Sequence, residues 1–480
     1  MSFASLKLKN KNLPFFRFEK IGKKILITGE TGKFLFLKEK DFLRFLKGKI
    51  KKTEPIYQEL LSKGFLRQNL KKEKQKILLS FLSRNSNLLE SGPSLHIIVP
   101  TLRCNYRCIY CQAAPIEKFP KNPDMDLGTA KATVDFIFSI KNPAMSIEFQ
   151  GGEPLANWPV VKFIIKYARK KNEIAKKKLR IALVSNLSLL NEEKLSFLLK
   201  NSVAICTSLD GPRKIHNKNR PCPFGDSYYL TTRWIKRLKN LEKKLNKYLI
   251  SALPTITKFS LEYPKEIVDE YRKWGFFEIH LRPLSYLGRA KISKSSLYYS
   301  PESFIKFWKK ALNYMIYLNK KGEFVLERET KIMLQKILTD KNPNYTDLHS
   351  PCGAVFGQIL YNFDGKILTC DEARMLGKES EKFVLGDVKK NNFLEIALSS
   401  KAKTMVLASC LESLSCDLCV FKPYCGVCPV KNYAYYGTLF PHIPSTDWCK
   451  IKKAQFEYIF QLLSKKDTAK ILNSWVKFSK

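Results

Sequence analysis

The chain lacks an uninterrupted apolar stretch of the ~18 residues that a membrane-spanning helix requires. Its first residues, MSFASLKLKNKNLPFF, contain neither the apolar core nor the small-residue cleavage site of a secretory signal peptide. No internal repeat of fixed period is found either. These absences predict a cytoplasmic protein with no membrane partner.

Acidic residues are also scarce. The sequence has 43 Asp and Glu against 85 Lys and Arg, for a formal net charge of +42. Such a surface attracts nucleic acid, anionic membranes or acidic proteins. The lysines recur along almost the whole chain instead of forming one patch, so we favour a lysine-rich composition over a nucleic-acid partner. With 45% apolar and 27% charged residues, the 480-residue chain is neither disordered, nor a collagen, nor a small disulfide-stabilised protein.

Cysteine, in contrast, is plentiful, with 13 residues. In a reducing compartment this favours metal or redox chemistry over disulfides. The cysteines fall into an early triplet and a long C-terminal group, with Cys206 and Cys222 between them. We expect Cys206 to be a buried small hydrophobe and assign no role to Cys222. The triplet is Cys104, Cys108 and Cys111; the later group is Cys352, Cys370, Cys410, Cys416, Cys419, Cys425, Cys428 and Cys449.

The patterning predicts four segments. Residues 1–85 combine short β-like runs with helical runs, which suggests a winged-helix-like module followed by a charged linker near Asn69–Lys76. Residues 90–320 form the core. Residues 345–455 are rich in Cys, Gly and Pro, and such a stretch often needs metal to fold. Residues 456–480 are predicted to be a basic helix.

The core alternates short apolar runs with amphipathic helical stretches. Six β/α units in series imply a parallel sheet with right-handed crossovers, an α/β fold. Six units are too few to close an eight-stranded barrel, so we expect an open, partial barrel with its active-site groups at the carboxyl ends of the strands. The predicted strands are 95–99, 145–149, 179–184, 203–208, 248–253 and 278–283.

The early triplet has the spacing C-x3-C-x2-C and follows the first core strand directly. Three thiolates can hold three irons of a [4Fe–4S] cluster and leave the fourth iron open. A zinc site with three cysteines would need a fourth ligand nearby, and His96 lies at the wrong end of the strand to supply one. We therefore favour an iron–sulfur cluster, with zinc as the alternative.

This spacing, followed by the sequence Gly151-Gly152-Glu153-Pro154 after the second strand, resembles the radical S-adenosylmethionine (SAM) superfamily. The run Ser208-Leu-Asp210-Gly-Pro with His216, Asn217 and Arg220 resembles anaerobic sulfatase-maturating enzymes. Val184-Ser185-Asn186 matches only in part, because Leu187 replaces a glycine. Ser208 and Asp210 could instead be ordinary turn residues. The resemblance implies that SAM contacts Tyr110, Gly151, Gly152, Glu153, Asn186, Ser208 and Asp210.

The later cysteines resemble the SPASM domain, which holds two auxiliary [4Fe–4S] clusters. That resemblance implies one cluster on Cys352, Cys370 and Cys428 and another on Cys416, Cys419, Cys425 and Cys449. The final spacing, x5-C-x2-C, is one residue shorter than is usual in that family. The first cluster would then have an open iron or a fourth ligand, for which Cys410 and His349 are candidates. The alternative is a double zinc ribbon.

A closer resemblance is to the B-type radical SAM maturase of the His-Xaa-Ser peptide system. It is carried by Leu281–Ser285, the Phe-Arg-Phe run at 16–18, and the stretch from Gly357 to Met375. In sulfatase-maturating relatives, the aspartate matching Asp371 is proposed to take a proton from the substrate, as a general base would. Asp371 could instead be a carboxylate that only supports the metal ligands.

Together the resemblances imply a radical SAM oxidoreductase that matures a ribosomally made peptide or protein. A 5′-deoxyadenosyl radical would abstract hydrogen from the substrate, and auxiliary clusters would carry electrons or bind substrate. The implied cofactors are SAM, one SAM-binding [4Fe–4S] cluster and two auxiliary clusters. The implied partners are a precursor peptide, a second radical SAM maturase and a reductant such as ferredoxin or flavodoxin. Two alternatives are an RNA-modifying radical SAM enzyme and a non-enzymatic zinc-binding nucleic-acid module.

Overall fold

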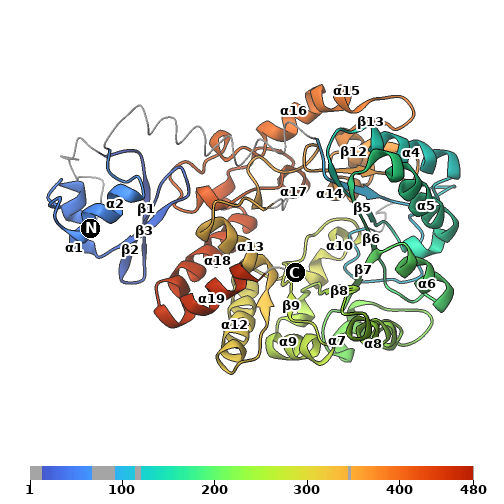
Figure 1. Cartoon of the computed structure of the whole chain (residues 1–480), viewed down its shortest axis with the longest axis horizontal. Helices are drawn as coiled ribbons and strands as arrows, with labels where there is room; N and C mark the ends of the chain where they lie inside the picture. Colours follow the sequence, from blue (N-terminus) through green and yellow to red (C-terminus); the bar gives the residue numbers. More distant parts are fainter. Residues whose placement is uncertain (1–12, 68–91, 114–119, 344–347, 479–480) are drawn as a thin grey trace.

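The computed structural model describes residues 13–67, 92–113, 120–343 and 348–478. The linker expected near Asn69–Lys76 and the first 12 residues lie outside these ranges. Among the described residues, none of the helices combines the length and apolar character needed to cross a bilayer. The chain forms an α/β core, with a small N-terminal module at one end of the molecule (Figure 1).

The centre of the molecule is a sheet whose strands follow the predicted order. Its five core strands run parallel, each paired with the next along the chain. Alternate residues on them are buried, as in β5, where Met145, Ile147 and Phe149 enter the hydrophobic core. The strands are β4 (Leu95–Ile98), β5 (Ala144–Phe149), β6 (Lys178–Val184), β7 (Val203–Ser208) and β8 (Ile250–Leu253).

Helices between these strands cover the outer face of the sheet (Figure 1). Several begin at a side chain that satisfies free amide groups: Asp126, Asn191 and Asp226 each accept a hydrogen bond from the backbone three residues on. The helices are α4 (Leu127–Ser139), α5 (Trp158–Ala175), α6 (Glu192–Lys200), α7 (Arg213–Asn219), α8 (Ser227–Leu245), α9 (Pro264–Lys273) and α12 (Pro301–Lys320). The partial barrel predicted from the sequence is confirmed.

The sixth predicted strand, 278–283, is mostly wrong. Only β9 (Glu278–Ile279) is regular, and it pairs with β10 (Leu326–Glu327) in a separate two-stranded sheet. A parallel bridge between Ile256 and Pro283 is what links this region to the end of β8. Short helices α10 (Arg289–Ile292) and α11 (Lys294–Leu297) follow, and α13 (Arg328–Leu338) follows β10.

The cysteine-rich segment extends the central sheet. Its strand β11 (Gln358–Tyr361) pairs in parallel with β4, and β12 (Lys366–Leu368) and β13 (Val384–Asp387) continue antiparallel to give eight strands. This segment is therefore joined to the core by backbone hydrogen bonds. Its helices are α14 (Asp371–Arg374), α15 (Phe393–Leu398), α16 (Ser400–Leu407) and α17 (Pro429–Tyr436).

The C-terminal helices differ from the predicted boundary at residue 456. Helix α18 (Asp447–Leu463) runs across that boundary without a break, and α19 (Lys466–Lys477) follows. Phe456 and Phe460 of α18 are fully buried in the main hydrophobic core. The tail is therefore a packed part of the fold that begins before residue 456.

The N-terminal module has three antiparallel strands and two helices: β1 (Arg17–Ile21), β2 (Lys24–Thr28), β3 (Phe34–Leu37), α1 (Glu39–Leu46) and α2 (Pro55–Ser62). Ile25 and Ile27 of β2, on one face of the sheet, share a hydrophobic cluster with Phe42 of α1. Residues Ile21 and Leu26 point the other way and belong to the main core of the protein. Figure 1 shows the module beside α18, and Glu19 of β1 pairs with Lys453 of that helix.

Candidate functional site

The early cysteine triplet lies on the loop after β4, at the carboxyl edge of the parallel sheet. Nitrogen donors approach its sulfur atoms. The Tyr106 backbone nitrogen lies 3.4 Å from Cys104 Sγ, and the side-chain nitrogen Nδ2 of Asn186 lies 4.0 Å from the same sulfur. The Arg220 Nη1 atom lies 3.9 Å from Cys108 Sγ. Such donors stabilise negative charge on sulfur, so this donor set fits an iron–sulfur cluster.

Burial raises the pKa of the Cys104 thiol to about 11 and that of the Cys108 thiol to about 12. The Cys111 thiol raises the pKa of both further and Cys104 raises that of Cys108, whereas the Arg220 guanidinium lowers the pKa of both Cys104 and Cys108. Metal binding to these thiols would therefore release protons. Arg220 is the nearby charge that favours the thiolate form.

The two glycines of the GGEP motif are required by contact with the chain itself. A Cβ on Gly152 would lie 2.1 Å from the Arg103 carbonyl oxygen, and one on Gly151 2.6 Å from that of Thr101. Gly151 also has a φ of 120°, a conformation open mainly to glycine. The motif thus brings the loop after β5 against the loop that carries the cysteines.

Glu153 is buried and its carboxylate is occupied by protein donors. It accepts hydrogen bonds from the Leu155 amide at 3.0 Å, the Ser185 hydroxyl at 2.8 Å and the Asn186 amide at 2.8 Å. The side chain therefore ties the end of β5 to the end of β6. It positions Asn186, whose side chain also reaches Asn105 of the cysteine loop at 3.0 Å.

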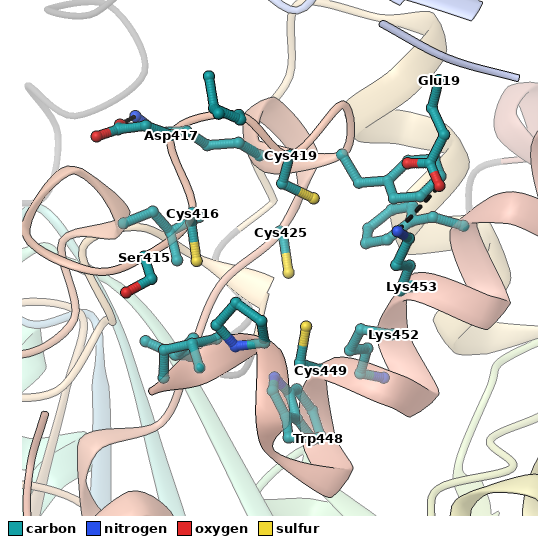
Figure 2. A pocket seen from close by; sticks show the side chains of 18 residues that line it. Glu19, Ser415, Cys416, Asp417, Cys419, Cys425, Trp448, Cys449, Lys452 and Lys453 are labelled. Atoms are coloured by element: carbon teal, nitrogen blue, oxygen red, sulfur yellow. Dashed lines mark hydrogen bonds and ion pairs between the residues drawn. The ribbon is translucent and has the colours of Figure 1, made fainter. Parts of the chain in front are cut away.

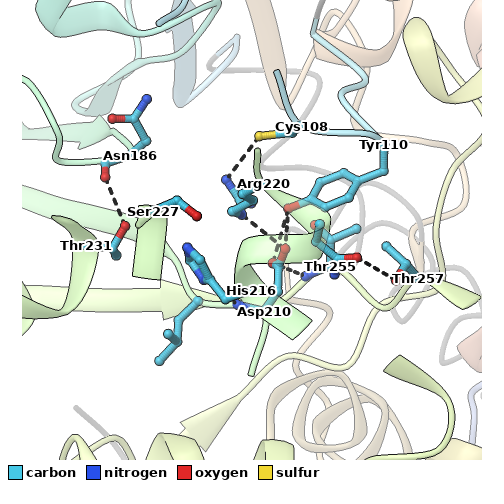
Figure 3. A network of polar contacts seen from close by, with 12 residues as sticks. Cys108, Tyr110, Asn186, Asp210, His216, Arg220, Ser227, Thr231, Thr255 and Thr257 are labelled. Atoms are coloured by element: carbon cyan, nitrogen blue, oxygen red, sulfur yellow. Dashed lines mark hydrogen bonds and ion pairs between the residues drawn. The ribbon is translucent and has the colours of Figure 1, made fainter. Parts of the chain in front are cut away.

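Asp210 is the centre of a buried polar network (Figure 3). Its carboxylate accepts hydrogen bonds from Tyr110 OH at 2.8 Å, from Arg220 Nε at 3.1 Å and from the Thr255 amide at 3.0 Å. Figure 3 shows Arg220 between Asp210 and Cys108. The network joins the cysteine loop, the ends of β7 and β8, and helix α7.

Arg220 was quoted as part of a motif but not predicted as a site residue. The signal that could have identified it is its spacing of ten residues from Asp210, because the chain returns to the strand end after the roughly two helical turns of α7. Ser208, at the end of β7, is half-buried on the same strand face as Cys206. His216 is buried beside the network, and burial lowers its pKa to about 4.

The structure also brings Cys352, Cys370 and Cys428 together. All three are buried in one hydrophobic cluster. Burial raises the pKa of Cys370 well above its ordinary value, and the Glu372, Cys428 and Cys352 side chains raise it further. These three cysteines come from three separate segments, so their meeting depends on the whole C-terminal fold.

The two candidates for a fourth ligand at that cluster differ. Both ring nitrogens of His349 have hydrogen-bond partners: Nε2 lies 2.9 Å from the Asn342 side-chain amide, and Nδ1 lies 2.7 Å from the Pro351 carbonyl oxygen. Cys410 is half-buried, and its neighbour Ser409 accepts a hydrogen bond from the Cys352 amide at 3.0 Å. Within the described part of the chain, the His349 ring is engaged at both nitrogens, whereas the Cys410 thiol has no such hydrogen bond.

The remaining four cysteines line one cavity of about 550 Å³ (Figure 2). Cys416, Cys419 and Cys425 lie on one loop, and Cys449 is in the first turn of α18. Four thiols around one cavity fit the ligand set of a [4Fe–4S] cluster. Four cysteines are also the ligand set of a structural zinc ion, so the zinc alternative predicted from the sequence stays open at this cavity.

Two further side chains face polar surroundings. Asp371, the first residue of α14, pairs with Arg374 at 2.8 Å. Cys206 is partly exposed as a residue, but burial of its thiol raises the pKa of that group to about 11. Ser251, Glu148 and Arg328 lie near this thiol, so its surroundings also include polar groups. His96 is buried against Tyr361 OH at 3.0 Å, away from the cysteine loop.

Comparison with known proteins agrees with this geometry. Residues 98–270 match the model of the Radical SAM superfamily. This part of the chain is similar to a radical SAM domain, and the predicted resemblance to that superfamily is confirmed at this level.

Two curated relatives are informative. The radical SAM cyclopropyl synthase TigE of Paramaledivibacter caminithermalis is 26% identical over 239 residues, which is 47% of this chain and 48% of that protein. The cysteine-type anaerobic sulfatase-maturating enzyme of Clostridium perfringens is 24% identical over 372 residues, 75% of this chain and 94% of that protein. This chain thus spans about half of TigE but nearly all of the sulfatase-maturating enzyme.

Two solved structures share the fold. The enzyme anSMEcpe with bound AdoMet has a TM-score of 0.65 at 21% identity and covers 79% of this chain and 99% of its own. Streptococcus suis SuiB bound to S-adenosylmethionine has a TM-score of 0.53 at 16% identity, with 90% and 98% covered. At these identities the likeness concerns the fold alone.

Proposed function

We propose that this protein is a radical SAM enzyme that modifies a ribosomally made peptide or protein. The observation that carries the proposal is the cysteine triplet itself: three thiols on one loop at the carboxyl edge of a partial barrel, against the GGEP loop and beside Arg220. Cys104, Cys108 and Cys111 would hold a [4Fe–4S] cluster whose open iron binds SAM. When bound, these groups would supply reductive SAM cleavage and hydrogen-atom abstraction.

The chain's own residues would fix the geometry. Asp210 holds Tyr110 and Arg220 in place from the floor of the site, and Glu153 holds the strand end that carries Asn186. Tyr110, Gly151, Gly152, Glu153, Asn186, Ser208 and Asp210 would orient SAM, some by contact and some through a neighbour. Asp371 would act as the general base on the substrate. Its pairing with Arg374 would hold its carboxylate in one orientation.

A peptide substrate is supported by what related proteins bind or modify. One relative is named a sulfatase-maturating enzyme, and structures sharing the fold were solved with a Kp18Cys peptide and with the precursor peptide SuiA. We extend the proposal to a His-Xaa-Ser type precursor, a second radical SAM maturase as partner, a ferredoxin or flavodoxin as reductant, and the cytoplasm as compartment. The segment 1–85 would grasp the peptide by strand addition.

The C-terminal cysteines would hold two auxiliary clusters, as in a SPASM domain. One would lie on Cys352, Cys370 and Cys428, and the other in the cavity of Cys416, Cys419, Cys425 and Cys449. The domain limits 90–320 and 345–455 remain part of the proposal. The two regions would act as one rigid unit, because β11 pairs with β4.

The test is metal content followed by SAM cleavage on the same anaerobic sample. We expect about twelve irons per chain, three four-iron clusters, and release of 5′-deoxyadenosine from SAM under reductant. Cys104→Ala should abolish release and remove about four irons. The matched control is Cys222→Ala, a cysteine outside both groups, which should change neither. Zinc in place of iron, or undiminished release from Cys104→Ala, would refute the proposal.

A further inference from the structure

The loop that carries Cys416, Cys419 and Cys425 is held from outside by the N-terminal module, more than 300 residues away in sequence. The loop has little regular structure of its own: its only helical element is a single turn, Lys422–Tyr424. A segment of this kind keeps one conformation only when other parts of the protein hold it. The contacts to the module supply that support.

Each of the three cysteines has a sequence neighbour bonded to the module. Asp417, which follows Cys416, receives a hydrogen bond on its carbonyl oxygen from Arg17 Nε at 2.5 Å. Arg17 belongs to β1, its side chain is only 1% exposed, and Glu30 pairs with it at 2.6 Å. The donor is therefore a buried, charged group already fixed within the module.

The other two contacts are buried as well. Val420, which follows Cys419, accepts a hydrogen bond on its carbonyl oxygen from the Thr28 hydroxyl at 2.8 Å. Tyr424, which precedes Cys425, donates from its hydroxyl to the Gly32 carbonyl oxygen at 2.9 Å. Loss of either partner would leave a buried polar group unpaired, which is unfavourable.

The module also reaches the wall of the cavity. Glu19 of β1 lines the four-cysteine cavity and pairs with Lys453 of α18 at 2.9 Å (Figure 2). Helix α18 is the element that carries Cys449. The pair is partly exposed and contributes little energy by itself. It does show that β1 touches both elements that present thiols.

We propose that the N-terminal module is a structural part of the four-cysteine site, with Arg17 and Thr28 as positioning residues for its loop. Because such coupling is reciprocal, iron in the cavity would stabilise the module, and a peptide bound to the module would change how tightly the iron is held. This inference rests on the proposed function, since it takes the cavity to be an iron–sulfur site.

The first experiment measures iron release from reconstituted protein to a chelator under anaerobic conditions. Arg17→Ala removes a charged donor, so release of the four irons of this site should accelerate about tenfold or more. Thr28→Val keeps the shape and removes one neutral hydrogen bond, for about a two- to tenfold acceleration. The control is Arg44→Ala, an arginine of the same module that pairs with Glu54 and Asp41 inside it.

The site is identified in the same experiment by the double variant Cys416→Ala/Cys419→Ala, which leaves only two of the four thiols. If this double variant leaves the iron content unchanged, the cavity holds no cluster and the proposed function fails at this point. If the double variant lowers iron while Arg17→Ala and Thr28→Val release it at the rate of Arg44→Ala, the present inference is overturned and the proposed function stands. Faster release from both variants, and not from the control, supports the inference.

Hydrogen exchange provides a second, independent measurement that needs no activity. The double variant Cys416→Ala/Cys419→Ala should accelerate amide exchange in β1 and β2, residues 17–28, relative to loaded wild type. Exchange in α1 and α2, which pack on the far face of the same sheet, should change less. Equal exchange in β1 and β2 with and without iron would contradict the reciprocal coupling.

Discussion

The ion pair between Asp210 and Arg220 gives the sharpest test of how the proposed SAM site is built. The Asp210 carboxylate is fully buried, and the Arg220 side chain is 11% exposed. Replacing Arg220 with Met keeps much of the volume and removes the charge. Breaking a buried pair by removing one partner costs about 3–5 kcal/mol, because it leaves the other charge uncompensated.

The lower end of that range applies here. Asp210 would keep the hydrogen bonds from Tyr110 OH and the Thr255 amide, so we expect Arg220→Met to cost ~3 kcal/mol. For a cooperative unit of about 150–250 residues that corresponds to a fall in Tm of roughly 6–12 °C, and for a larger unit to a smaller fall. The matched control is Arg237→Met, since Arg237 pairs with Glu192 at 3.2 Å on the surface. That variant should cost no more than about 1 kcal/mol.

The assay is denaturant unfolding of wild type and variants under identical anaerobic conditions. The double variant Asp210→Asn with Arg220→Met should recover part of the loss, because it removes both charges together; the two substitutions would then be non-additive by ~1 kcal/mol or more. The reasoning is refuted if Arg220→Met costs no more than Arg237→Met, or if the double variant shows simple additivity.

Two more outcomes follow from buried groups. In Gly152→Ala the new Cβ would lie 2.1 Å from the Arg103 carbonyl oxygen, so this variant should lose more than ~2 kcal/mol of unfolding free energy. The control is Gly29→Ala, whose Cβ would have no atom nearer than 3.8 Å; in the same assay it should change the unfolding free energy by no more than ~1 kcal/mol. Burial lowers the pKa of His349 to about 4, so the unfolded chain binds the proton first and stability falls as pH drops from 6.5 towards 4. Between pH 7 and pH 5 the free energy of unfolding of His349→Gln should therefore fall by ~2 kcal/mol less than that of wild type. The variant should also keep its iron. Loss of iron, or a pH dependence of stability equal to that of wild type, would contradict this.

The core was predictable because its signals are local. Five of the predicted strands appear in the sheet, each within a few residues of its expected limits, since short apolar runs and capped helices alternate along the chain. The sixth failed because Glu278–Pro283 carries mixed polar and apolar side chains, and only two of its residues form regular pairs. Its apolar pattern arises from burial of Ile279 and Leu281, not from a long strand.

Contacts between distant segments were not predictable. Nothing in the sequence indicates that β11 pairs with β4, or that Arg17 reaches Asp417. Each such contact depends on how whole segments pack, and a single polar residue carries no sign of its partner. Spacing groups Cys416, Cys419 and Cys425, and the resemblance to the SPASM domain adds Cys449; in the structure Cys449 of α18 lines the same cavity as the other three.

The motif residues divide according to what their side chains contact, and this decides how their variants must be interpreted. The carboxylates of Glu153 and Asp210 are occupied by protein donors, and the Tyr110 hydroxyl is bound to Asp210. Substituting any of them changes the frame of the site before it changes any contact to a ligand. Ser208 is half-buried at the end of β7, and within the described part of the chain its side chain makes no hydrogen bond that supports the site. Loss of SAM cleavage in a variant therefore indicates a direct contact between that residue and SAM only where the free energy of unfolding is unchanged. We expect Ser208→Ala to leave the free energy of unfolding unchanged and Asp210→Asn to lower it.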